Sequence, residues 1–116
     1  MKVKNVKVTR AKVKCDDREI LKANIFIEGM GIQLELNLGF EKEEDMQKIK
    51  KIMEYAEVDV FEDLEGKILR IMEKDGKVEG IGHAINSRFI PLSNGKRLME
   101  VTEEAFKAIC EPEQFE

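Results

Sequence analysis

Three residues near position 88 have side chains that together suit a nucleotide. Asn86 can hydrogen-bond a base edge, Arg88 can neutralise a phosphate and Phe89 can stack on a ring. They follow Gly80 and Gly82, and glycines inside a strand mark a bulge or a place where a backbone or a ligand comes close. In the alternative, Phe89 enters the core and Arg88 pairs with a nearby acid. The spacing alone favours this alternative.

Other residues could add to such a site. Lys67 and Arg70 lie upstream and could meet phosphates. Phe26 points away from Ile25 and Ile27 in an alternating run, which makes it a candidate for a second layer, a subunit contact or a stacking surface. Because an aromatic ring must bury a large area, we favour cover by a helix of the same chain.

The sequence lacks the patterns of catalytic, metal and cofactor sites. His83 is the only histidine, and a structural or rim position is favoured over a metal ligand or a base. Cys15 and Cys110 have no short Cys or His spacing, so two reduced, half-buried thiols are expected. The glycine pair lacks the Lys-Ser/Thr of a phosphate loop, and acidic residues 59–65 lack the order of a calcium loop. We therefore expect no enzyme, no metal and no cofactor.

The net charge of −4 conceals an uneven distribution. Residues 1–15 carry six bases and no acid, whereas residues 41–66 carry ten acids and four bases. The basic arm could bind phosphates, but lysines alternating with valines are more typical of a protected edge strand. The acidic chain as a whole disfavours a long nucleic acid as the main partner.

The apolar spacing predicts three strands followed by a helix. The inward-facing residues change phase near Thr9–Arg10, which predicts a bulge or bend in the first strand. Two alternating runs, within 21–27 and 32–38, predict a hairpin around Gly29–Gly31. From Glu43 the apolar period becomes helical, with one stripe that comprises Met46, Ile49, Ile52, Met53 and Ala56.

A connecting segment and a second hairpin come next. Residues 58–64 are expected to form about one helical turn capped by Asp59. Its inward-facing residues would be Val60, Phe61 and Leu64. Strand-like residues 67–72 and 78–85 flank Asp75-Gly76, a dipeptide that favours a tight hairpin turn.

The C-terminal part adds a turn at Asn94-Gly95 and a short helix after a Thr102 cap. Together the segments predict a single domain, residues 1–116, of the α+β class. Its antiparallel sheet would have about five strands, built as a three-stranded meander, a helix and a β-hairpin, with one amphipathic helix and a short C-terminal helix. The apolar runs are too short to span a membrane and no secretory segment begins the chain, so a cytoplasmic protein without membrane contact is expected.

One stretch resembles a group of small, largely uncharacterised bacteriophage and prophage proteins. It covers about residues 44–90, and the similarity lies in VDVFEDLEGK at 58–67, Arg70, DGKV at 75–78, IGH at 81–83 and Arg88-Phe89. The chain differs from that group at Phe61, where tryptophan is usual, and at Ser87-Arg88-Phe89, where Lys-Trp-Phe is usual. The order and spacing of the shared residues imply a common fold.

The resemblance implies a phage accessory protein that is not an enzyme and acts in the cytoplasm of an infected bacterium. The first hypothesis is a sponge that sequesters a small, cyclic nucleotide immune signal, similar to anti-CBASS or anti-Thoeris proteins, as a homo-oligomer with sites near subunit boundaries. Cationic residues would meet phosphates and a phenylalanine would stack on a base. The expected ligand-binding residues are Asn86, Arg88, Phe89, Arg70, Lys67, Gly80, Gly82, His83 and Phe26.

Two other functions remain open. A protein–protein inhibitor, similar to an anti-CRISPR, could use the acids of residues 41–66 to mimic nucleic acid. Lys48, Lys50 and Lys51 interleave with those acids, and a Glu44–Lys48 pair is typical of an ordinary helix surface. An accessory factor in phage replication or assembly is the third hypothesis.

Overall fold

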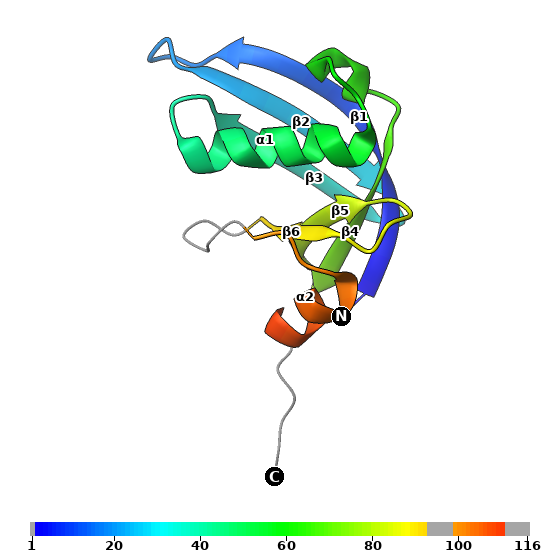
Figure 1. The fold of residues 1–116 in the computed structure, drawn as a ribbon. Coiled ribbons are helices and arrows are strands. Elements are labelled where there is room, and N and C mark those ends of the chain that lie inside the picture. The colour runs from blue at the N-terminus through cyan, green and yellow to red at the C-terminus, as the bar shows by residue number, and fades with distance from the viewer. Residues whose placement is uncertain (1, 93–98, 111–116) are drawn as a thin grey trace.

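The computed structural model describes residues 2–92 and 99–110, which form one antiparallel sheet with two α-helices and a 3-10 helix (Figure 1). The strand order is β3-β2-β1-β4-β5-β6. This confirms the α+β class and adds a short sixth strand, β6, that the sequence did not predict. The strands are β1 (Lys2–Cys15), β2 (Leu21–Gly29), β3 (Ile32–Gly39), β4 (Ile68–Lys74), β5 (Lys77–His83) and β6 (Phe89–Pro91); the helices are α1 (Glu43–Ala56), η1 (Phe61–Leu64) and α2 (Glu103–Cys110).

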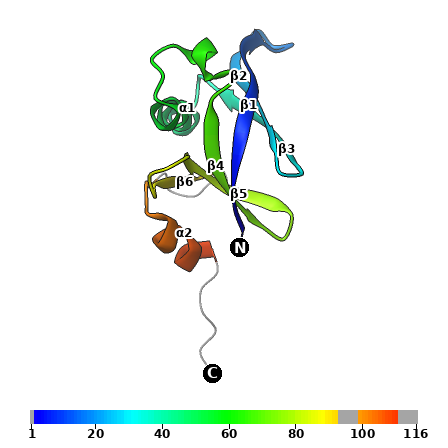
Figure 2. The ribbon, with the colours of Figure 1, turned by 90° about the vertical axis from the view of Figure 1, so that its right-hand side faces the viewer.

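β1 is shared between the two halves of the sheet. Its first half pairs with β4 and its second half with β2, and the register shifts between Val8 and Arg10. This confirms the predicted bulge, and because a bulged strand bends and twists more strongly, the sheet curls into a half-barrel (Figures 1 and 2). The interpretation of the basic arm as an edge strand is wrong, since β1 lies in the middle of the sheet.

The main core lies inside the curl, where α1 packs on β3, β4 and β5. Ile49, Ile52 and Tyr55 are buried there, as the helical period predicts for the first two. The buried face of α1 is rotated from the predicted stripe, because Met46 is 43% exposed whereas Lys48 is 1% exposed. A charged side chain therefore lies inside the half-barrel, a position that the apolar pattern alone does not predict.

A second, smaller core lies on the other side of the sheet, under α2. It contains Met72, Phe89 and Phe106, with Val3 packed against them. The rings of Phe89 and Phe106 are tilted by 46° at a centroid separation of 6.0 Å. α2 begins as predicted, because the Ala105 N–H donates to Thr102 Oγ1 over 3.2 Å.

The turn between α1 and β4 differs from its prediction. The N-cap position of η1 is occupied by Val60, and no side chain caps the helix, so the expected Asp59 cap is wrong. Val60 is 48% exposed, so its expected inward orientation is also wrong. Backbone bonds anchor this turn instead: the Gly66 N–H donates to the Val8 carbonyl over 2.7 Å. Leu64 is fully buried, as predicted. The expected Asn94-Gly95 turn lies outside the described residues.

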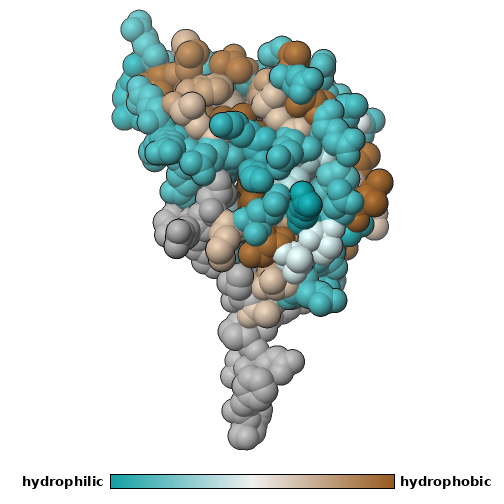
Figure 3. Space-filling view, in the orientation of Figure 1, coloured by the Kyte–Doolittle hydropathy of each residue, from teal (hydrophilic) through white to brown (hydrophobic). Residues whose placement is uncertain are grey.

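The outer side of α1 is largely hydrophilic (Figure 3), with exposed Lys50, Glu54 and Glu57. In the same view, apolar side chains lie above α1. At the end of the β1–β2 hairpin, Val13 and Leu21 are 44% and 49% exposed. No helix in residues 2–92 or 99–110 is long and apolar enough to cross a membrane.

Gly80 and Gly82 lack side chains because other parts of the same chain fill the space. A Cβ at Gly80 would collide with the Phe106 ring, and a Cβ at Gly82 would collide with the Arg88 carbonyl oxygen and lie 2.8 Å from Phe89 Cδ2. Both glycines face the second core, so the close approach expected from the sequence is made by α2 and the chain just before β6.

We expect Gly82→Ala to destabilise the fold by about 1–3 kcal/mol, because a methyl group forced against a backbone carbonyl must push β6 away from β5. The measurement is the free energy of unfolding in urea. Gly39→Ala is the control, since its Cβ would have ordinary contact with Asp45 Oδ2 at 3.7 Å. Equal stability of the two variants would contradict the packing described for β6.

Candidate functional site

Phe89 is fully buried between the sheet and α2, so its ring is closed to a ligand. This corrects its prediction as a stacking residue. β6 pairs with β5 on one edge, and Phe89 also bridges Val101, which places the side chain in the second core. The alternative drawn from the sequence, that Phe89 enters the core, is the arrangement observed.

The remaining predicted residues at this end of the sheet do not form one site. The space at Gly80 and Gly82 is filled by the chain itself, which corrects their prediction as a place of ligand approach. The Arg70 guanidinium donates to Glu103 Oε1 over 3.2 Å and to Asn5 Oδ1 over 3.0 Å, so it is held beneath α2. Lys67 is exposed and lies where β1 and the η1 turn meet.

His83 organises the loop that carries Asn86. Its Nδ1 accepts hydrogen bonds from the backbone N–H groups of Ile85 and Asn86, each at 3.0 Å. In the neutral ring the proton must then be on Nε2, which donates to Glu57 Oε2 over 2.7 Å. The favoured structural position of His83 fits these contacts.

A half-buried polar network lies beside Arg88. The Tyr55 hydroxyl donates to Glu100 Oε2 over 2.7 Å, and Lys51 Nζ donates to the same oxygen over 3.3 Å. Burial raises the pKa of Tyr55, and the charge of Glu100 raises it further. The hydrogen bond from Tyr55 lowers the pKa of Glu100, with smaller contributions from the positive charges of Lys51 and Arg88. Arg88, whose charge acts on this network, and Asn86 are both exposed.

Phe26 lies on the face of the sheet that points away from α1, and no described helix covers it. The expected helix cover is therefore wrong. Instead, the guanidinium of Arg10 on the neighbouring strand lies over the ring, with its carbon 5.3 Å from the ring centroid. Phe26 thus remains available as a stacking residue.

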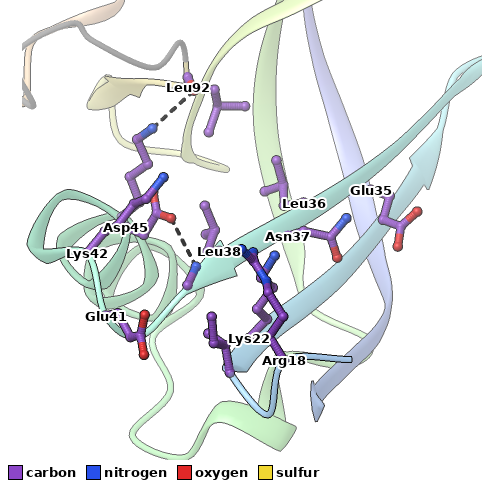
Figure 4. Close-up of a pocket in the computed structure, with 13 residues that line it drawn as sticks. Arg18, Lys22, Glu35, Leu36, Asn37, Leu38, Glu41, Lys42, Asp45 and Leu92 are labelled. Carbon is purple, nitrogen blue, oxygen red and sulfur yellow. Dashed lines mark hydrogen bonds between the residues drawn. The ribbon is translucent and has the colours of Figure 1, made fainter. Parts of the chain in front are cut away.

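A pocket of ligand size lies at the outer edge of β3, where α1 begins and where Leu92 follows β6 (Figure 4). Its volume of about 460 Å³ is within the usual range of small-molecule sites. The lining residues are Arg18, Ile20, Lys22, Glu35, Leu36, Asn37, Leu38, Gly39, Glu41, Lys42, Asp45, Lys48 and Leu92.

Two hydrogen bonds, both drawn in Figure 4, fix the walls of this pocket. The Gly39 N–H donates to Asp45 Oδ2 over 3.0 Å, which ties the end of β3 to the first turn of α1. The buried Lys48 Nζ donates to the Leu92 carbonyl over 3.1 Å and lies 3.5 Å from Glu44 Oε1. The Glu44 contact is an ion pair without a good hydrogen bond, because that oxygen has no hydrogen-bond partner among the described groups.

The accessible charge of the pocket is mixed, because the exposed cations Arg18 and Lys42 share its lining with the exposed acids Glu35 and Glu41. Arg18 and Lys42 are exposed, and neither forms an ion pair within the described residues, while Lys22 lies 3.6 Å from Asp16 Oδ2. In Figure 4, Arg18 and Lys22 lie on one side of the end of β3 and Lys42 on the α1 side. Leu36 and Leu38 add apolar surface, so the pocket suits a ligand with an anionic group and an apolar ring.

Sequence reasoning missed this pocket because its residues follow no local pattern. Arg18 is in the β1–β2 turn, Lys22 is in β2 and Lys42 precedes α1. The pairing of β2 with β3, which places Lys22 opposite Gly39, brings them together. One signal was present: Lys48 lies one residue before Ile49 and four before Ile52, so it shares their side of the helix.

Neither a metal-binding cluster nor a relationship to a known family adds a further site among the described residues. Within residues 2–92 and 99–110, no group of three or more His, Cys, Asp or Glu side chains could hold a metal ion. Cys15 is a free, exposed thiol, which corrects its half-buried prediction. No family model, no curated protein and no solved structure matches this chain. The resemblance to phage proteins stays a prediction.

The Tyr55–Glu100 hydrogen bond predicts a pH dependence of stability. The folded-state pKa of Glu100 is lowered, so its contribution is fully present above the unfolded pKa of about 4.3 and is lost as pH falls through the folded pKa. The folded-state pKa of Tyr55 is raised, so its contribution is present below the unfolded pKa of about 10 and is lost as pH rises toward the folded value. Glu100→Gln should lower the free energy of unfolding by about 1–2 kcal/mol at pH 7 and by less at pH 3.

Urea unfolding across this pH range is the measurement. Glu104→Gln, an exposed position four residues later in α2, is the matched control and should change stability little at either pH. A constant difference between wild type and Glu100→Gln from pH 7 to pH 3 would contradict the hydrogen bond to the carboxylate.

Proposed function

We propose that the protein binds a small phosphate-bearing ligand, without catalysis, in the pocket at the edge of β3. One observation carries the proposal: Arg18 and Lys42 bring unpaired positive charge to the rim of a hollow of about 460 Å³ that also has apolar walls. A phosphate is met well by a guanidinium, which can donate two parallel hydrogen bonds, and by a lysine acting as a point charge.

A nucleotide is the ligand class that fits both parts of the pocket. Its phosphate would lie between Arg18 and Lys42, and its ring would lie against Leu36 and Leu38. Lys48 is occupied by the Leu92 carbonyl, so it would contribute a fixed positive charge instead of a direct contact. Two acids of the lining are engaged, because Glu35 accepts a hydrogen bond from Asn24 at 2.6 Å and Asp45 accepts one from Gly39. Glu41 is exposed in the same lining, so the phosphate would lie on the side of Arg18 and Lys42 that faces away from it.

Sequestration of a nucleotide immune signal is the biological role that we propose for this binding. It agrees with the role implied by the resemblance to phage proteins and needs only tight, saturable binding. The site differs from the one expected at Arg88 and Phe89, because it lies at the opposite edge of the sheet from β6.

The test is a thermal-shift and retention assay with cyclic di- and trinucleotides and ADP-ribose derivatives. A ligand at about 100 times its Kd should stabilise the protein by about 2.7 kcal/mol. Combining Arg18→Glu with Lys42→Glu should weaken binding at least about 10-fold, since each charged hydrogen bond contributes about 1.5–3 kcal/mol. Lys50→Glu with Lys77→Glu is the matched control, because both lysines are exposed and lie outside the pocket.

Two results would contradict the proposal. The absence of a thermal shift across the panel would show that the protein does not bind this class of ligand. An equal loss of affinity in the variant with Lys50→Glu and Lys77→Glu would show that net charge alone causes the effect. Heating the complex should release the ligand chemically intact, and a converted product would contradict binding without catalysis.

A further inference from the structure

The side of β1, β2 and β3 that points away from α1 forms an open face. Figure 2 shows α1 on one side of these strands and no described helix on the other. The core under α2 is formed by β4, β6 and Val3 near the start of β1. The residues that define the open face here are Lys7, Arg10, Lys12, Lys14, Phe26, Glu28 and Glu35.

The centre of the open face is a stacking platform. Arg10 and Phe26 are direct cross-strand partners, and the guanidinium carbon of Arg10 lies 5.3 Å from the ring centroid. Nucleobases that are not paired stack on both aromatic rings and guanidinium planes. The bulge at Thr9 helps to hold this geometry, because the Thr9 hydroxyl donates to the Phe26 carbonyl over 3.3 Å.

Positive charge runs along β1 beside this platform. Lys7, Arg10, Lys12 and Lys14 all point to the open face, and none forms an ion pair within the described part of the chain. Alternate residues on a strand are about 7 Å apart, so these cations form a row beside the ring. The net charge of −4 does not describe this surface, because the excess of acids lies in residues 41–66.

Polar groups beside Phe26 could contact a base edge. A shallow hollow of about 290 Å³ is lined by the Phe26 ring, Glu28, Gln33 and Glu35. Carboxylates accept hydrogen bonds from exocyclic amino groups of bases, and amides both donate and accept. The anionic and amide groups thus lie on the β2–β3 side of the ring, and the cations lie on the β1 side.

We infer that the open face binds single-stranded nucleic acid. Bases would stack on Arg10 and Phe26, and phosphates would follow the cations of β1. A duplex hides its base faces and a mononucleotide spans only one position of the row, so an unpaired strand uses this surface most fully. The inference revises the expectation, based on net charge, that long nucleic acid is disfavoured. The inference does not rest on the proposed ligand pocket at the edge of β3, because Arg18 and Lys42 play no part in binding to the open face.

Fluorescence anisotropy with labelled oligo(dT) and oligo(rA) 20-mers is the test. The logarithm of the binding constant should fall linearly with the logarithm of salt concentration, with a slope of about −2 to −3 for three or four phosphate contacts. Phe26→Ala should weaken binding about 5- to 150-fold through the loss of stacking. Phe26→Leu, which keeps apolar volume, should keep the thermal stability and still weaken binding. Lys12→Glu with Lys14→Glu should reduce the salt slope.

Two matched controls separate this surface from the other proposals. Arg18→Glu with Lys42→Glu should leave oligonucleotide binding nearly unchanged, and so should Lys50→Glu with Lys77→Glu. The inference is overturned if wild type does not bind the 20-mers at 20 mM salt, if a duplex of equal length binds as tightly, or if the Lys50 and Lys77 pair loses as much affinity as the Lys12 and Lys14 pair.

Discussion

β1 is hydrogen-bonded along both of its edges, to β4 over its first half and to β2 over its second, and the rest of the structure depends on this sharing. A central strand pairs with one neighbour on each edge, and the register shift between Val8 and Arg10 bends β1 between its two partners. The curl that results gives the sheet an inside, which α1 fills, and leaves an outer face of β1, β2 and β3 uncovered by the described helices.

The same curl explains why the two candidate binding surfaces are built from separate parts of the chain. Folding β3 toward the start of α1 places Gly39 next to Asp45 and brings Lys48 to the Leu92 carbonyl, which forms the edge pocket. Turning the bases of β1 outward places Arg10 over Phe26. The uneven charge of the sequence is thus kept in space, with the acid-rich residues 41–66 near α1 and η1 and the bases of β1 on the open face.

Local features were predicted well because neighbouring residues decide them. Asp75-Gly76 adopts positive φ at both residues, as a tight hairpin turn requires, and Thr102 caps α2 through its own hydroxyl. The candidate site was predicted less well. Phe89 was proposed to stack on a ligand and is buried, because the position of its side chain depends on α2, which follows it along the chain by more than ten residues. Arg10 was considered only as one base of an arm that could bind phosphates, and Lys42 was not proposed as a site residue, since neither belongs to a recognisable motif.

The sequence by itself determined the α+β class, the two hairpins, the bulge near Thr9 and the amphipathic helix from Glu43, because alternation, helical period and turn residues act over a few positions. Only the tertiary structure decided that β1 is central, that Lys48 is buried and that Arg88 lies beside Tyr55 and Glu100. These features depend on which strands pair and which face a helix covers. Contacts between residues far apart in the chain decide both, and a local sequence pattern does not reveal such contacts.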